Sequence, residues 1–211
     1  MATRPPHLRF VETPPEPAEE GGARLGAEVL AAAQRGDVHA WARLYEHHYM
    51  GVYRQLRYLA GDASLAEELA QETFAQAMAC HARFDPTRQV AGWLHGIALN
   101  VVRKFWRKQR NAARAHERLE QALRTGPQGA ADPHSNHVRR ERGRALAAVL
   151  EDLPPRWREA FVLRELQGLS TAEAAGVLGI TTENLAVRVN RARVRIREEL
   201  GRRGWLPGGA S

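Results

Sequence analysis

The chain has 211 residues, of which 44% are hydrophobic, so it is long enough for one large or two small packed domains. Lys and Arg outnumber Asp and Glu by 31 to 24, which favours nucleic acid as a partner over a membrane surface; a merely soluble basic protein has the same balance. The single cysteine excludes an intramolecular disulfide and any multi-cysteine metal site. No apolar run approaches the roughly 20 residues of a membrane span, and the N-terminus has no apolar signal core. A cytoplasmic protein without membrane insertion is therefore expected.

The first half of the chain is predicted to be a tail followed by helices. Residues 1–24 include five prolines and a glycine pair, a composition typical of disorder. Ser64 and Glu67 form an S-x-x-E capping box, which predicts the start of a helix. Pro86 cannot continue that helix and separates it from the next. The expected helices span 26–35, 38 to Gly61, about 64–81 and about 90–110.

The second half begins with a stretch of different character. The segment TGPQGAADPHSN is turn-forming and has no apolar period, which is typical of a linker. A second helical set begins near Arg144, and no segment of the chain shows the two-residue alternation of a half-buried strand. The predicted fold is therefore all-α, with two small helical domains joined by a flexible linker. Its expected parts are a disordered tail (1–24), a first domain (25–112), a linker (113–143), a second domain (144–203) and a short tail (204–211).

The stretch STAEAAGVLGITTENLAVRVNRAR, residues 170–193, has the pattern of a helix-turn-helix. Ser170 and Glu173 form a capping box that starts a short helix. Gly179 suits the left-handed position after a helix end, and Thr181 or Thr182 can cap the helix that follows. A short helix, a turn of about three residues and a second helix define the motif.

The second helix of this motif has two faces when residues are placed about 100° apart. One narrow apolar stripe consists of Leu185, Val189, Ala192, Ile196 and Leu200. A neighbouring polar stripe consists of Asn184, Arg188, Arg191 and Arg195. Cations beside a buried stripe suit a helix that lies in the major groove of DNA, although a solvated amphipathic helix also carries arginines.

The helix expected at 90–110 has a similar design. Its predicted buried side consists of Leu94, Ile97, Ala98, Val101 and Phe105, and its adjacent polar face of Trp93, Asn100, Lys104 and Arg107. Residues 103–114 hold six cations and no anion, and Phe84 lies in the loop just before the helix. Aromatic rings among cations suit single-stranded nucleic acid, because rings stack on unpaired bases while cations follow the backbone. A core role for Trp93 and a solvated face for the cations are the alternatives.

The helix before it has the opposite charge. Glu67, Glu68 and Glu72 lie beside Gln71 in an otherwise basic protein. An acidic helix repels DNA, so this face is predicted to dock on a basic protein surface. The alternative is an ordinary exposed helix with acids near its N-terminus, where the helix dipole favours them.

Three longer stretches carry these features in chain order: LAEELAQETFAQA, then RFDPTRQVAGWLHGIALNVV, then LEDLPPRWREAFVLRELQGLSTAEAAGVLGITTENLAVRVNRARVRIREEL. In this order they resemble bacterial RNA polymerase sigma factors of the extracytoplasmic-function (ECF) type, over about residues 26–110 and 144–200. In that family the first stretch docks on the polymerase clamp helices, and the second opens and reads the −10 promoter element. The third reads the −35 element.

The resemblance implies core RNA polymerase, promoter DNA in duplex and melted form, and an anti-sigma factor released by a stress signal as partners. The polymerase-docking residues would be Glu68, Gln71 and Glu72. The −10 residues would be Phe84, whose loop accepts a flipped base, with Trp93, Asn100, Lys104 and Arg107. The −35 residues would be Thr182, Asn184, Val187, Arg188, Arg191 and Arg195. Ala186 and Val187 replace a common Lys–Ser pair of the family, so a different −35 sequence is expected, with Val187 against a thymine methyl group.

Two other classes of function are alternatives to a sigma factor. A one-component regulator would use the helix-turn-helix as a homodimer on palindromic DNA, without polymerase. The acidic helix followed by the aromatic and cationic helix argues against it. An enzyme is not expected, because the chain has no carboxylate pair at metal-ligand spacing, no Ser–His–Asp motif and no phosphate-binding glycine loop. No catalytic residue, cofactor, metal or small-molecule substrate is therefore expected.

Overall fold

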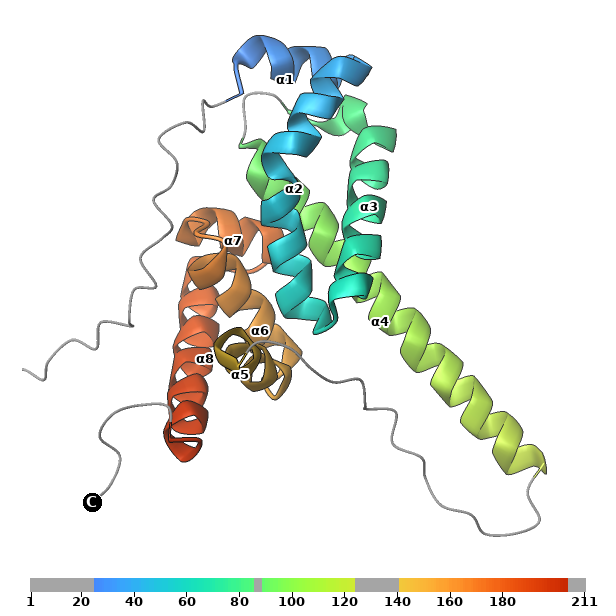
Figure 1. Ribbon diagram of the computed structural model, residues 1–211, viewed down its shortest axis with the longest axis vertical. Coiled ribbons are helices and arrows are strands. Elements are labelled where there is room, and N and C mark those ends of the chain that lie inside the picture. The colour runs from blue at the N-terminus through green and yellow to red at the C-terminus, as the bar shows by residue number, and fades with distance from the viewer. Residues whose placement is uncertain (1–24, 86–88, 124–140, 205–211) are drawn as a thin grey trace, which may run out of the picture.

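The computed structural model describes residues 25–85, 89–123 and 141–204, and every regular element in these ranges is a helix (Figure 1). The first domain contains α1 (Ala27–Gln34), α2 (Val38–Ala60), α3 (Ala63–Ala79), the 3-10 helix η1 (His81–Arg83) and α4 (Val90–Leu123). The second domain contains α5 (Glu141–Glu151), α6 (Pro155–Phe161), the π-helical turn η2 (Val162–Leu166), α7 (Thr171–Leu178) and α8 (Thr182–Arg202). The prediction of an all-α fold with two helical domains is confirmed. The expectations for the two tails and for residues 124–140 lie outside the described residues.

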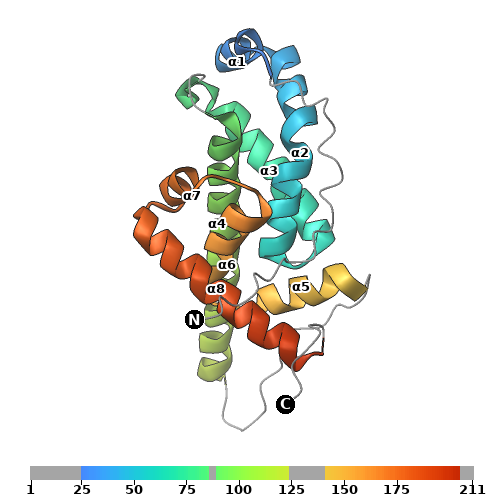
Figure 2. The same cartoon turned by 90° about the vertical axis from the view of Figure 1, so that its left-hand side faces the viewer.

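In the first domain α2, α3 and α4 pack against one another around an apolar core, and α1 lies against α2 (Figures 1 and 2). The indole nitrogen of Trp41 donates a buried hydrogen bond of 2.9 Å to the carbonyl oxygen of Ala33, which ties α1 to α2. Fully buried side chains of this core include Leu44, Leu56 and Leu94. Each contributes about 1.5–3 kcal/mol by leaving water. None of the helices in the described ranges combines the length and apolarity of a membrane span.

The boundary between α2 and α3 lies where a glycine and an aspartate follow each other. Gly61 ends α2 in the left-handed conformation, at φ +80°, as expected from the sequence. Asp62 then caps α3, because its carboxylate accepts a 2.8 Å hydrogen bond from the backbone N–H of Leu65. The prediction of a capping box at Ser64 and Glu67 is therefore wrong. Asp is as good an N-cap as Ser, and it comes two residues earlier in the chain.

Helix α4 is longer than the sequence analysis predicts. It was expected to end near Arg110, with a linker from residue 113, but it continues to Leu123 (Figure 1). The segment 111–123 consists largely of Ala, Glu, Arg, Leu and Gln, which have high helix propensity. The first strong helix breakers after it are Gly126 and Pro127. The end of this helix is therefore better predicted from the breakers than from the loss of apolar periodicity.

The helix-turn-helix of the second domain forms as predicted. Ser170 and Glu173 make a reciprocal capping box at the start of α7, and Gly179 ends this helix with φ +65°. Thr181, not Thr182, caps α8, because its hydroxyl accepts from the backbone N–H of Asn184 at 3.3 Å. The sequence left open which threonine would act as the cap. These caps satisfy backbone groups that a helix end leaves without partners.

A π-helical turn between α6 and α7 was not foreseen. The sequence predicts one continuous helix from Arg156 to Gly168, but α6 ends at Phe161 and η2 follows at once. Val162 and Leu163 of η2 are fully buried, so the wider turn allows both apolar side chains to face inward. Propensity does not distinguish such a turn from an α-helix, because the difference arises from packing.

The second domain packs directly on the first. Helix α7 lies against α4, while η2 and α5 lie against α2 (Figure 2). With the amide of Gln167 oriented for hydrogen bonding, its nitrogen donates to the carbonyl oxygen of Gly51 at 3.1 Å and its oxygen accepts from the N–H of Gln55 at 3.3 Å. Glu151 of α5 approaches Gly61 so closely that a Cβ atom there would lie 3.2 Å from its carboxylate carbon. The two domains therefore meet through apolar and polar contacts.

This packing changes which side of α4 is buried. Leu94, Ala98 and Val101 are buried as predicted, whereas Ile97 and Phe105 are half-buried. Four further side chains of α4 are buried that lie outside the predicted stripe: Val90, His95, Leu99 and Val102. The sequence analysis gave α4 a single buried side because it treated the first domain alone. The second domain adds another apolar contact to the same helix.

His95 is one of few polar side chains in this core. Its Nδ1 donates to the side-chain oxygen of Gln55, whose side-chain nitrogen donates to the His95 carbonyl oxygen at 3.1 Å. Burial, with a smaller contribution from His48, lowers the pKa of His95 to about 4. Burial and the charge of His47 lower the pKa of His48 to about 4 as well. Both rings are therefore neutral near pH 7.

We expect the free energy of unfolding to decrease as the pH falls from about 6.5 to about 4. In this window the unfolded chain, with His pKa values near 6.5, binds protons that the folded chain does not. Chemical denaturation at a series of pH values measures this. His95→Gln should flatten the dependence, whereas His39→Gln, at an exposed position of α2, should leave it unchanged. Equal slopes for the His95 variant and the parent chain would contradict the explanation.

The capping box of α7 predicts a local effect on stability. Ser170→Ala should lower the free energy of unfolding by about 1 kcal/mol, because the N–H of Glu173 loses its acceptor. Thr171→Ala changes the neighbouring exposed hydroxyl and serves as the control. Urea denaturation would measure both variants, and a larger loss for Thr171→Ala than for Ser170→Ala would show that the cap is not the cause.

Candidate nucleic-acid and polymerase interfaces

Helix α8 has the two faces that the sequence predicts. Leu185, Val189, Ala192 and Ile196 are buried, and Leu200 is half-buried. The proposed −35 residues lie on the outer surface: Thr182, Asn184, Val187, Arg191 and Arg195 are exposed, and Arg188 is half-buried. Val187 is 48% exposed although it is apolar. The structure therefore leaves these side chains accessible to a partner.

Local contacts hold several of the α8 side chains in place. The side-chain oxygen of Asn184 accepts from Nε of Arg188 at 2.9 Å, and the hydroxyl of Thr182 donates to Glu183 at 2.9 Å. The guanidinium of Arg191 lies over the ring of Trp157, 5.9 Å from its centroid, which is a cation–π contact. These contacts reduce the conformational entropy that the side chains would lose on binding a partner.

One cation of α8 has a structural partner that the sequence analysis missed. Arg193 donates to Glu165 of η2 at 2.8 Å, with the two side chains 44% and 25% exposed. This ion pair connects α8 to the π-helical turn. The two residues are 28 positions apart, so no local pattern in the sequence could reveal the pair.

The polar face of α4 is also accessible. Asn100, Lys104 and Arg107 are exposed, and they follow one another at helical spacing along one side of the helix. Trp93, two turns before Asn100 on the same side, is half-buried. Its ring lies 5.1 Å from that of Phe84 and 6.4 Å from that of Trp41, measured between centroids. Trp93 therefore belongs partly to the core and partly to the polar face.

Phe84 lies between η1 and α4, and its ring is buried. The side chain is 1% exposed, packed against Trp93, and the Phe84 carbonyl oxygen accepts a 2.9 Å hydrogen bond from Gln34. A base could stack on this ring only if the ring left the core. The sequence analysis places Phe84 in a proline-containing loop, and the resemblance gives that loop the role of accepting a flipped base. Residues 86–88 of that loop lie outside the described residues.

The acidic face of α3 is exposed as predicted at Glu68, Gln71 and Glu72. Glu72 accepts a 2.6 Å hydrogen bond from Gln76, one turn along the helix. Together these side chains leave carboxylate and amide groups on the outer surface of a helix whose buried side packs on α2 and α4.

A row of tyrosines on α2, which the sequence analysis did not single out, lies beside this helix. The rings of Tyr45 and Tyr49 are 5.0 Å apart, those of Tyr49 and Tyr53 are 6.1 Å apart, and Tyr45 lies edge-on to Phe74 of α3 at 4.8 Å. Burial, followed by the charges of Tyr45, Glu67 and Tyr53, raises the pKa of Tyr49. The four-residue spacing of the tyrosines was the signal that could have revealed this row.

The candidate residues thus lie on three separate helix faces and do not converge on one cavity. The −10 set is on α4 except for Phe84, which directly follows η1, while the −35 set is on α8 and the docking set on α3. Within the described parts of the chain no three His, Cys, Asp or Glu side chains are grouped in a way that would hold a metal ion. The arrangement offers surfaces for macromolecules, with cations on two of the faces and carboxylates on the third.

Two family models match the chain. Residues 44–112, which include α3 and much of α4, match "Sigma-70 region 2". Residues 143–196, which include the helix-turn-helix, match "Sigma-70, region 4".

The chain is similar to curated sigma factors over most of its length. It is 31% identical over 190 residues to the ECF RNA polymerase sigma factor SigE of Mycolicibacterium smegmatis, covering 89% of this chain and 71% of the relative. It is also 31% identical over 162 residues to the RNA polymerase sigma factor CarQ of Myxococcus xanthus, covering 77% and 90%.

Two solved structures have a similar fold. CnrH, solved in complex with the cytosolic domain of CnrY, is 27% identical with a TM-score of 0.62, covering 84% of this chain and 97% of that chain. The sigma factor RpoE of Bartonella quintana, solved with the anti-sigma factor NepR, has a TM-score of 0.61 at 22% identity, covering 78% and 98%. With the matches to both regions and to ECF factors over most of their length, the chain belongs to the ECF group of the sigma-70 family of RNA polymerase sigma factors.

Proposed function

We propose that this protein binds core RNA polymerase and directs it to promoters by reading DNA with both domains. The observation that carries the proposal is the arrangement of three exposed faces. Two are polar and cationic, on α4 and α8, and one is acidic, on α3. The two DNA-reading faces belong to different domains, so polymerase would be needed to set the spacing at which they meet one promoter.

Helix α8 would read the −35 element in the major groove. Side chains near the start of a recognition helix reach base edges, which fits Asn184, Val187 and Arg188, while later cations hold phosphates. Arg188 is suited to guanine, since its guanidinium can donate two hydrogen bonds to one base edge. The exposed Val187 would add contact with a thymine methyl group.

The polar face of α4 would capture melted −10 bases. Opening the duplex costs a few kcal/mol per base step, and stacking of a captured base on an aromatic ring returns about 1–3 kcal/mol. Asn100 would recognise a base by hydrogen bonds, and Lys104 and Arg107 would hold the backbone. The buried ring of Phe84 would support Trp93 from the core. Direct stacking of a base on Phe84 would require the ring to leave its present packing.

The acidic face of α3 would dock on the clamp helices of the polymerase. Carboxylates are the groups expected on a surface that binds a basic protein partner and repels DNA. We also propose that an anti-sigma factor holds the protein until a stress signal arrives, and that the protein acts in the cytoplasm. The solved complex of the relative CnrH with the cytosolic domain of CnrY supports a protein partner that binds the sigma factor itself.

Run-off transcription tests the proposal directly. Core polymerase with this protein should produce transcripts from a promoter library that core polymerase alone does not, and the active promoters should share −35 and −10 motifs. Absence of such transcripts, together with tight binding of a homodimer to palindromic duplex DNA, would establish the one-component regulator in its place.

Single substitutions on the two DNA-reading faces should separate their roles. Asn100→Ala and Arg188→Ala should each reduce protein-dependent transcription about tenfold, since each removes base contacts of about 1–3 kcal/mol. Asn111→Ala, farther along α4, and Arg197→Ala, on the other side of α8 from Arg188, are the matched controls. Initial rates on a promoter found in the library screen would be compared, and equal losses in the variants and their controls would contradict the assignment.

Charge reversal on α3 should abolish docking. The double variant Glu68→Lys, Glu72→Lys should weaken binding to core polymerase by at least about tenfold, because two attractive contacts become repulsive. Glu28→Lys and Glu46→Lys, at exposed positions of α1 and α2, together make the same change in net charge. Affinity measured with a fluorescent label on the polymerase distinguishes the two double variants. Unchanged affinity for the α3 variant would rule out this docking face.

A further inference from the structure

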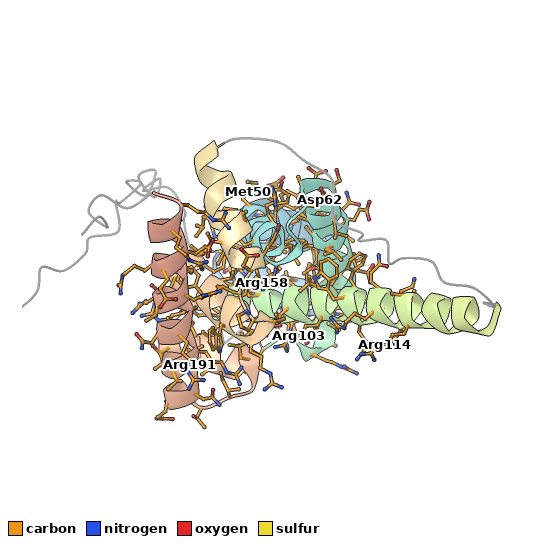
Figure 3. The ribbon with its side chains drawn as sticks, turned by 90° about the horizontal axis from the view of Figure 1, so that it is seen from below. Met50, Asp62, Arg103, Arg114, Arg158 and Arg191 are labelled. Atoms are coloured by element: carbon orange, nitrogen blue, oxygen red, sulfur yellow. The ribbon has the colours of Figure 1, made fainter. Side chains whose placement is uncertain are left out.

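One ion pair joins the proposed −10 helix to the second domain. Arg103 of α4 donates from Nε to one carboxylate oxygen of Glu159 at 2.9 Å and from NH2 to the other at 2.6 Å. Glu159 lies on α6, and its side chain is 12% exposed, while that of Arg103 is 43% exposed. Figure 3 shows Arg103 on the part of α4 near the second domain, with Arg114 farther out along the same helix. The two-point geometry is the strongest form of a guanidinium–carboxylate contact.

Arg103 borders the face that is proposed to hold DNA. It comes three residues after Asn100 and four before Arg107, so its side chain is a neighbour of both on the helix surface. A guanidinium binds phosphate with the same paired geometry as it binds carboxylate. An arginine at this position could therefore take one phosphate of a DNA strand that lies along Asn100, Lys104 and Arg107.

The packing between the domains holds Glu159 at this position. Ala160 and Phe161, which follow it on α6, are both buried. Gln167 reaches the backbone of α2, and α7 packs on α4. The hydrogen bonds that Arg103 donates to Glu159 also raise the pKa of Arg103, because the carboxylate stabilises the charged guanidinium. The carboxylate is thus presented to Arg103 only while the two domains are in contact.

We propose that Arg103 is a further DNA-phosphate-binding residue and that Glu159 occupies its guanidinium when the domains are packed together. The carboxylate stands where a phosphate would bind, so closure of the two domains and binding of DNA to α4 compete for one side chain. Because binding linkage is reciprocal, DNA on α4 loosens the domain contact to the same degree that the contact weakens DNA binding. The inference rests on the proposed function, since it takes the polar face of α4 as the DNA site.

Opposite effects of two substitutions in the same ion pair test the proposal. Glu159→Gln should raise the affinity of the full chain for a forked DNA with a single-stranded thymine extension by about threefold, a size typical of an exposed ion pair. Arg103→Gln breaks the same pair but removes the phosphate contact, so affinity should fall below that of the parent chain. Glu28→Gln, on α1, removes one carboxylate away from the ion pair and controls for net charge. Fluorescence anisotropy of labelled DNA at low salt gives the affinities.

The salt dependence and the shape of the chain provide independent readouts. DNA affinity falls as salt concentration rises, and the steepness of this fall is the slope of log affinity against log salt. The slope should be smaller in magnitude by about one for the double variant Arg103→Gln, Glu159→Gln than for the single variant Glu159→Gln, because one phosphate contact is lost. Small-angle scattering should give a larger radius of gyration for both single variants. If Glu159→Gln folds poorly, Glu159→Asp keeps the charge, shortens the reach and should also raise DNA affinity.

A salt bridge that only holds the domains together makes a different prediction. Breaking it from either side would then change DNA affinity in the same direction, and that result would overturn the proposal. Equal affinities for Glu159→Gln and Glu28→Gln would overturn it as well. The transcription assay with the parent chain tests the proposed function separately, because it needs neither substitution.

Discussion

Helix α4 must bury apolar side chains against two partners at once, its own domain and α7 of the second domain. Along the N-terminal part of α4, which packs on other helices, only a narrow polar face is left exposed. The ion pair with Glu159 and the DNA contacts that we propose for α4 must therefore share that face. The domain contact and the proposed DNA site are close together because two apolar interfaces leave no other room on this part of the helix.

Charge is sorted by helix in this basic protein of net charge +7. Cations gather on the exposed faces of α4 and α8, whereas α3 exposes carboxylates beside the tyrosine row of α2. A polyanion is attracted to the first two helices and repelled from the third. The nucleic acid and the protein partner that we propose would therefore bind separate surfaces of the chain without competing.

The features that could be predicted from the sequence are those set by neighbouring residues. The buried stripe of α8, the Ser170 capping box and the end of α2 at Gly61 follow from helical spacing and local backbone chemistry. Contacts between distant segments decided the rest. The burial of Leu99 and Val102, the enclosure of Phe84 and the pairing of Arg103 with Glu159 depend on how two domains and several helices meet. Most of the proposed site residues lie on exposed faces, but Phe84 is buried, and no local pattern in the sequence indicates the contact of Arg103 with Glu159.

Gly61 lies at the contact between the two domains as well as at the end of α2. Its left-handed conformation ends α2, and asparagine or aspartate can adopt that conformation at modest cost. A Cβ atom at this position would also meet the carboxylate of Glu151 of the second domain. Because this carboxylate is the end of an exposed and flexible side chain, it can rotate away from a new neighbour. The backbone conformation therefore restricts the choice of residue at this position more than the neighbouring domain does.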